Sequence, residues 1–115
     1  MDTSNIIQTQ YQLVKLAVAL RTARSAVGWS QDELARVTGI PKTTIARFET
    51  MEGGLKAAQL ATLINTYNSK GIDVEFLRGN KVTIKIDEDA LRSSGQRLTD
   101  SNGRRSDRRK KLPTI

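Results

Sequence analysis

The sequence contains no cysteine and no histidine among its 115 residues. Without cysteine there is no disulfide framework and no thiolate nucleophile, and without either residue the usual sulfur and nitrogen ligands of zinc are missing. We therefore expect no metal site and no cofactor. The remaining residues form no set that pairs a nucleophile with a base, so we expect that the protein is not an enzyme.

Long apolar runs are also missing. No stretch approaches the roughly 20 apolar residues that a membrane-spanning helix needs, and the start "MDTSNIIQTQ" lacks the basic segment and apolar run of a signal peptide. These absences predict a cytoplasmic protein with no membrane partner. The length suits one ordinary domain with a modest core.

Basic charge, in contrast, is abundant and unevenly distributed. The net charge is +7, and residues 92–115 contribute +6 of it, because they hold eight Lys and Arg residues against two Asp. The rest of the chain is nearly neutral. A basic tail on a neutral body suggests a polyanionic partner, and nucleic acid is the commonest one in the cytoplasm.

The first part of the chain has apolar residues that recur on one stripe of a helix: Leu13, Ala17, Leu20 and Val27. This pattern predicts a helix over about residues 5–27. Arg24 occupies a stripe position where a core residue would be expected. Gly28 can adopt the left-handed conformation that ends a helix, so the end of this helix is better defined than its start.

The stretch "WSQDELARVTGIPKTTIARFE" predicts two short helices rather than one. Ser30 and Glu33 have the spacing of a capping box, which starts a helix over residues 31–38. Gly39 ends that helix. Pro41 suits the first turn of the next helix, over residues 41–50, because its missing N–H would have no partner there in any case.

The rest of the chain predicts a fourth helix, over residues 57–69, and a β-hairpin, over residues 72–89. A three-residue loop at 79–81 would unite four apolar residues on one face of the hairpin, whereas a two-residue loop would separate them: Val74, Phe76, Ile84 and Ile86. We favour the three-residue loop. The segment 90–115 is basic and too poor in apolar residues to offset its ordering entropy, so we expect it to be disordered without a partner.

These elements give a mainly α fold, with a helical domain over residues 1–71 and the hairpin as a possible dimerisation element. Two short helices across a tight turn form the helix-turn-helix arrangement, whose second helix lies in the DNA major groove. Over residues 20–67 the sequence resembles the Xre/Cro group of phage-repressor-like helix-turn-helix domains. The resemblance rests on "SQDELARVTGIPKTTIARFE", where several spacings match together. "GIDVEF" and the following strand are similar to a bacterial variant with a C-terminal hairpin, which implies a four- to five-helix domain followed by that hairpin.

The resemblance also implies which residues contact DNA. Three match base-reading positions and one is a further candidate: Lys42, Thr43, Arg47 and Thr44. Lys and Arg can donate to guanine, and Thr can hydrogen-bond or contact a thymine methyl group. Gln31 matches a position that holds a phosphate at a helix N-terminus. The alternative is that all of these are merely exposed helix residues. Many members carry Ser or Thr where Pro41 stands, so a cap is absent here.

The run "RRSDRRKK" could hold further phosphates beside the main site, or could be only a solvated tail. Its basic residues are Arg104, Arg105, Arg108, Arg109, Lys110 and Lys111. Members of the family also commonly pair an Arg late in the first helix with a Glu late in the recognition helix. Arg24 and Glu49 occupy these positions, so the resemblance implies a partly buried ion pair; the alternative is that Arg24 extends into solvent.

The function implied is a sequence-specific DNA-binding transcriptional regulator, most simply a repressor that binds a palindromic operator in double-stranded DNA as a homodimer. Two surfaces could form the dimer: the hairpin edge, which we favour, or the apolar stretch with Ile6, Ile7, Leu13 and Val14. The alternative function is an antitoxin that neutralises a partner toxin and represses its own operon. No effector pocket is visible in the sequence, so we expect control by a regulatory protein partner or by the abundance of the protein rather than by a bound metabolite.

Overall fold

The computed structural model describes residues 3–75 and 81–100. Within these ranges the chain forms five helices and two strands: α1 (Thr3–Val27), α2 (Gln31–Thr38), α3 (Lys42–Glu49), α4 (Ala57–Ser69), β1 (Ile72–Glu75), β2 (Thr83–Ile86) and α5 (Glu88–Asp100). The predicted fold class, mainly α with a C-terminal β-hairpin, is confirmed. No helix in the described ranges is long and apolar enough to cross a membrane.

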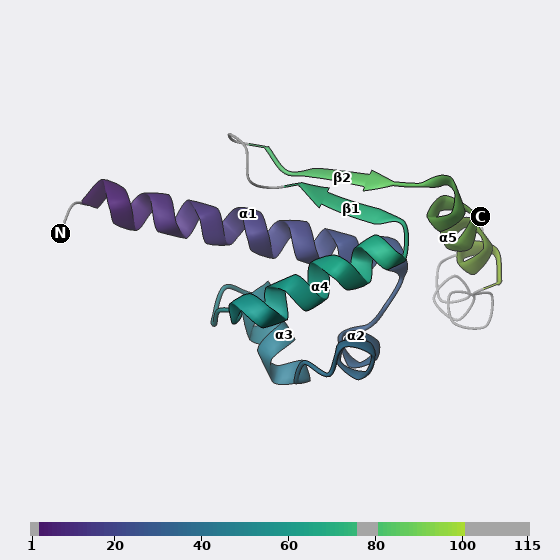
Figure 1. Ribbon diagram of the computed structural model, residues 1–115, viewed down its shortest axis with the longest axis horizontal. Helices are drawn as coiled ribbons and strands as arrows, with labels where there is room; N and C mark the ends of the chain where they lie inside the picture. The colour runs from purple at the N-terminus through teal and green to yellow at the C-terminus, as the bar shows by residue number, and fades with distance from the viewer. Residues whose placement is uncertain (1–2, 76–80, 101–115) are drawn as a thin grey trace, which may run out of the picture.

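Helix α1 runs along the length of the molecule and organises the other elements (Figure 1). The hairpin lies along one side of α1, while α3 and α4 pack on the other side, and α5 lies beside the C-terminal end of α1. The core forms where these elements meet, and its most buried residues include Ala19, Leu20, Ala23, Leu34, Tyr67 and Ile72. The N-terminal part of α1 extends beyond the other elements.

The predicted helix boundaries around α2 are confirmed. The Ser30 hydroxyl accepts a hydrogen bond from the Glu33 N–H at 3.0 Å, and the Glu33 carboxylate accepts one from the Ser30 N–H at 3.1 Å. Gly28 and Gly39 end α1 and α2 with φ of +85° and +75°, a backbone region that residues other than glycine rarely adopt. The Gly39 N–H donates to the Ala35 carbonyl at 2.8 Å.

Helix α3 begins one residue later than expected, because Pro41 is its N-cap and not its first helical residue. Proline has no polar side chain, so the cap makes no side-chain hydrogen bond. The Pro41 carbonyl still accepts the first helical bond, from the Ile45 N–H at 3.1 Å. The other end is also shorter than the predicted 41–50, since the helix stops at Glu49.

The hairpin has the predicted facing and a different register. Val74 pairs with Ile84, so Val74, Ile84 and Ile86 share one face as expected. A loop at 79–81 would instead have paired Val74 with Ile86, so the register is shifted by two residues, a change that leaves every side chain on the same face. Residues 76–80, with Phe76 and most of the turn, lie outside the described residues.

Helix α5 corrects the prediction that residues from 90 onward are disordered. The Asp87 carboxylate caps the helix by accepting a hydrogen bond from the Ala90 N–H at 2.8 Å. Ala90 is itself buried. The cap, the buried Ala90 and the hydrogen bonds from Ser94 and Arg97 to the Ala26 carbonyl together order a segment whose composition is mostly polar. Residues 101–115 lie outside the described residues.

Candidate nucleic-acid interface

The helix-turn-helix unit consists of α2 and α3, which pack against each other across the turn at Gly39. Helix α3 also contacts α1, on the side away from the hairpin (Figure 1). It therefore has an inner face toward the core and an outer face toward solvent. The inner face buries Ile45 and Phe48, each 2% exposed.

The inner face also holds the expected ion pair. Arg24 Nε donates to Glu49 Oε2 at 2.8 Å, and Arg24 Nη2 donates to Glu49 Oε1 at 2.7 Å, which is a bidentate geometry. Arg24 Nη1 donates to the Trp29 carbonyl at 2.9 Å. The side chains of Arg24 and Glu49 are 18% and 5% exposed. The pair therefore ties the end of α3 to both α1 and the start of the α2 region.

Gln31, which is expected to hold a phosphate, also joins this network. Its Nε2 donates to Glu49 Oε1 at 3.0 Å, so the side-chain amide contacts the buried carboxylate. The physical reason is that a buried carboxylate needs hydrogen-bond donors, and Gln31 supplies one beside Arg24. The backbone N–H of Gln31 lies in the first turn of α2, where N–H groups have no intrahelical partner.

The pKa values of Arg24 and Tyr67 are shifted by their surroundings at this ion pair. The hydrogen bonds that Arg24 donates to Glu49 raise the pKa of the Arg24 guanidinium, against the opposing effect of burial. Burial raises the pKa of the Tyr67 phenol, and the negative charge of Glu49 raises it further. The Tyr67 hydroxyl is buried and has no hydrogen-bond partner among the described residues. Both groups stay in their protonated form near neutral pH.

The outer face of α3 carries the residues expected to read bases. Lys42, Thr43 and Arg47 are exposed, and Thr44 is half-buried beside them. Lys42 Nζ lies 3.2 Å from an exposed Asp32 carboxylate, and Arg47 Nη2 donates to the Glu52 carbonyl at a long 3.4 Å. Exposed contacts of this kind contribute little to stability and are easily exchanged.

Two further expectations concern the basic run and a metal site. The six basic residues of the run at 104–111 lie outside the described residues. In the part of the chain that the structure describes, no group of three or more acidic side chains could hold a metal ion. At the helix-turn-helix the structure buries the Arg24–Glu49 ion pair against the core and leaves the α3 cations Lys42 and Arg47 exposed.

Comparison with known proteins supports the assignment of α2 and α3 as a helix-turn-helix. A family model described as a helix-turn-helix domain matches residues 15–77, which is more than half of the chain. The match begins within α1 and covers α2, α3, α4 and β1. No curated protein and no solved structure matched the chain. The chain belongs to the helix-turn-helix family of DNA-binding domains.

Proposed function

We propose that the protein is a sequence-specific transcriptional regulator of the Xre/Cro group, which acts in the cytoplasm as a repressor at a two-fold symmetric operator. The observation that carries this proposal is the outer face of α3, where Lys42, Thr43 and Arg47 are exposed together. The ion pair behind them holds α3 at a fixed angle to α1. A rigid helix with exposed donors is what major-groove recognition requires.

In this proposal each side chain has a separate role. Lys42 and Arg47 donate to guanine O6 and N7, and Thr43 bonds a base or contacts a thymine methyl group. Thr44, which is half-buried, contacts DNA at the edge of the interface. The backbone N–H of Gln31 binds a phosphate at the N-terminus of α2, in place of its side chain. The basic residues of 104–111 bind further phosphates and increase the salt dependence of binding.

The regulator binds as a homodimer, because a single small domain makes few base contacts and symmetric operators suit two copies. We favour the hairpin as the dimer surface. Among the described residues its sheet has two strands, so the outer edge of β2 faces no third strand, and Ile86 is 37% exposed. The N-terminal part of α1 is the other candidate, with Leu13 39% and Val14 43% exposed.

The antitoxin alternative depends on a segment that folds on a partner toxin. The hairpin or the basic tail at 90–115 is the candidate for such a segment, and residues 101–115 of the tail lie outside the described residues. The exposed cations of α3 serve either function, since an antitoxin of this kind also represses its operon. No described feature favours a toxin partner, so the regulator is the better supported function.

Selection of bound sequences from a random duplex library, at one stated salt concentration, tests the proposal. We expect a two-fold symmetric motif with half-sites about one helical turn apart. Enrichment of no motif, with binding that depends only on charge, would contradict sequence-specific regulation. A control protein lacking residues 101–115 distinguishes the two sources of affinity, because the motif is expected to persist without the tail.

A further inference from the structure

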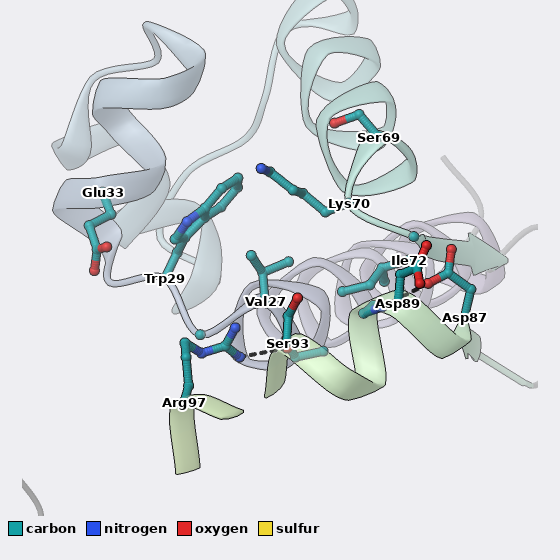
Figure 2. A pocket seen from close by; sticks show the side chains of 14 residues that line it. Val27, Trp29, Glu33, Ser69, Lys70, Ile72, Asp87, Asp89, Ser93 and Arg97 are labelled. Carbon is teal, nitrogen blue, oxygen red and sulfur yellow. Dashed lines mark hydrogen bonds between the residues drawn. The ribbon is translucent and has the colours of Figure 1, made fainter. Parts of the chain in front are cut away.

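A cleft separates α5 from the ends of α1 and α4, and we call it the α5 cleft (Figure 2). Its volume is about 520 Å³. Sites for small molecules typically enclose about 300–1,000 Å³, so the α5 cleft is large enough for a ligand. It lies away from the outer face of α3, and none of the residues proposed to contact DNA lines it.

The middle of the α5 cleft is apolar. Val27, Ile72 and Ala90 contribute aliphatic side chains, and Ile72 and Ala90 belong to the buried core. Trp29 forms one wall, and it is the single tryptophan of the chain. Figure 2 shows its ring facing across the cleft from Val27. An apolar body with a flat or branched shape would therefore contact protein in the middle of the cleft.

Two cations lie at the Trp29 end. Lys70 Nζ lies 5.7 Å from the centre of the Trp29 ring, a cation–π geometry that leaves its three N–H donors available. Arg97 Nη2 donates to the Ala26 carbonyl and to the Ser94 hydroxyl, each at 3.1 Å. A guanidinium has five N–H donors, so this contact fixes the group without using all of them.

The position of the Arg97 guanidinium depends on Gly28. A Cβ at position 28 would overlap the guanidinium, so the absence of a side chain lets the charged group lie against the backbone. The cation is thereby placed at the mouth of the cleft, between α5 and the end of α1 (Figure 2). The contact therefore joins a glycine at the end of α1 to a cation on α5, two segments that are distant in the sequence.

Two carboxylates, Asp87 and Asp89, line the other end, beside Ile72 in Figure 2. Asp87 already caps α5 through one oxygen, whereas Asp89 is exposed at the cleft. A third carboxylate in the lining, Glu33, is engaged in the capping box of α2. Glu33 lies at the Trp29 end in Figure 2, so that end holds two cations and one carboxylate that already accepts a backbone hydrogen bond, the other end holds two carboxylates, and the middle is apolar.

We propose that the α5 cleft binds a small zwitterion that carries a carboxylate and an ammonium at opposite ends of an apolar body, such as a dipeptide with free termini. The carboxylate contacts Lys70 and Arg97, and the ammonium contacts Asp89. A simple anion would leave the carboxylate end without a partner, and a simple cation would leave the two basic side chains without one. Only a ligand with both charges satisfies both ends.

Trp29 connects the α5 cleft to the recognition helix. Its side chain lines the cleft, while its carbonyl accepts the hydrogen bond from Arg24, which in turn holds Glu49 of α3. A ligand that shifts Trp29 therefore changes the support of α3. This coupling rests on the proposed DNA-binding function, and by linkage DNA must change the ligand affinity by the same factor.

The binding test uses the emission of Trp29 on the full chain without DNA. Dileucine with free termini is titrated beside two blocked analogues, N-acetyl-dileucine and dileucine amide. We expect a saturable change with free dileucine and about tenfold weaker binding of each analogue, because each has lost one charge-assisted contact. No saturable change, or equal affinity for all three compounds, would overturn the proposed site.

Matched variants test whether the ligand binds in the α5 cleft. Lys70→Gln and Asp89→Asn each remove one charge from an exposed side chain that lines the cleft, and we expect about tenfold weaker binding in both. Arg92→Gln is the control, because Arg92 pairs with Glu88 on α5 and does not line the cleft. Equal affinity of all four proteins would overturn the assignment to the α5 cleft.

The coupling is tested separately with the DNA duplex selected by the protein. Free dileucine is expected to change the affinity for that duplex, and the blocked analogues are not. Binding of dileucine with no change in DNA affinity would overturn the coupling. A failure to bind any duplex specifically would contradict the proposed function, whereas the fluorescence titration would still decide whether the cleft binds a zwitterion.

Discussion

Glu49 and Lys42 are charged residues at opposite ends of the same short helix, one buried and one exposed, and they are held in different ways. Glu49, on the inner face, accepts three side-chain hydrogen bonds of 2.7–3.0 Å from Arg24 and Gln31. Lys42, on the outer face, makes one 3.2 Å contact with an exposed Asp32. The inner face therefore fixes the helix, and the outer face can exchange its partners for DNA at little cost.

The largest expected effect is on the inner face. Glu49→Ala leaves Arg24 and Gln31 without the carboxylate that they bind. We expect the free energy of unfolding to fall by about 3 kcal/mol, at the lower end of the range for breaking a buried pair, because the Arg24 side chain retains 18% exposure. A urea melt measures this change. A loss of less than about 1 kcal/mol would show that the network does not fix α3.

A matched control for this change is Glu52→Ala, which removes an exposed carboxylate just after α3. Its free energy of unfolding is expected to stay within about 0.5 kcal/mol of the wild-type value. If both variants lost the same stability, the effect would come from net charge and not from the buried pair.

Lys42→Ala tests the outer face. We expect specific DNA binding to weaken by about 1–3 kcal/mol, through the loss of a base contact. The free energy of unfolding should change by less than about 0.5 kcal/mol, since the side chain is exposed. Fluorescence anisotropy with a labelled duplex measures the first quantity and a urea melt the second. A large loss of stability with unchanged DNA affinity would reverse the comparison between the two faces.

The exposed Lys42–Asp32 ion pair is expected to contribute still less to the free energy of unfolding. A double-mutant cycle with Lys42→Ala and Asp32→Asn isolates the interaction between the two side chains. Both side chains are more than half exposed, so we expect a coupling energy below about 0.5 kcal/mol. A coupling above about 1 kcal/mol would mean that the outer face is held nearly as firmly as the inner one.

Tyr67→Phe sharpens the comparison, because it changes a buried polar group that has no partner among the described residues. At neutral pH we expect a change near zero or a small gain in stability, about 0–1 kcal/mol, since no hydrogen bond within the described structure is lost. A loss above about 1 kcal/mol would show that the hydroxyl has a partner.

Alkaline pH is expected to increase the difference in stability between the wild-type protein and Tyr67→Phe. Burial raises the pKa of Tyr67 above its ordinary value of 10.0, so the unfolded chain releases this proton first. The contribution of the neutral phenol to stability is therefore complete below pH 10 and is lost as the pH rises above it. Urea melts on both sides of this pH are expected to show a steeper loss in the wild-type protein than in Tyr67→Phe.

Local signals explain what could be predicted from the sequence. The capping box of Ser30 and Glu33 and the glycines at 28 and 39 act within a few residues, so they placed the ends of α1 and α2 correctly. The Arg24–Glu49 contact spans 25 residues of sequence and was accessible only through the family resemblance. Lys42, Thr43 and Arg47 were likewise identified through the family resemblance, and all three are exposed in the structure.

The features that the sequence did not predict depend on tertiary contacts. Gln31 turns inward because a buried carboxylate from another helix lies within reach, which no local pattern indicates. Helix α5 is held partly by hydrogen bonds from Ser94 and Arg97 to the Ala26 carbonyl, about 70 positions away in the sequence. A count of apolar residues does not detect such bonds. The α5 cleft was missed for the same reason, because α5 forms one of its walls.

The measurement that tests the central claim most directly compares wild type with Arg47→Ala on two duplexes, the selected site and a shuffled site, at one salt concentration. The outer face of α3 is predicted to read bases, so the affinity ratio between the two duplexes should fall by about 1–3 kcal/mol in the variant. An equal loss of affinity on both duplexes would contradict the account, because it would show that Arg47 contacts only phosphate.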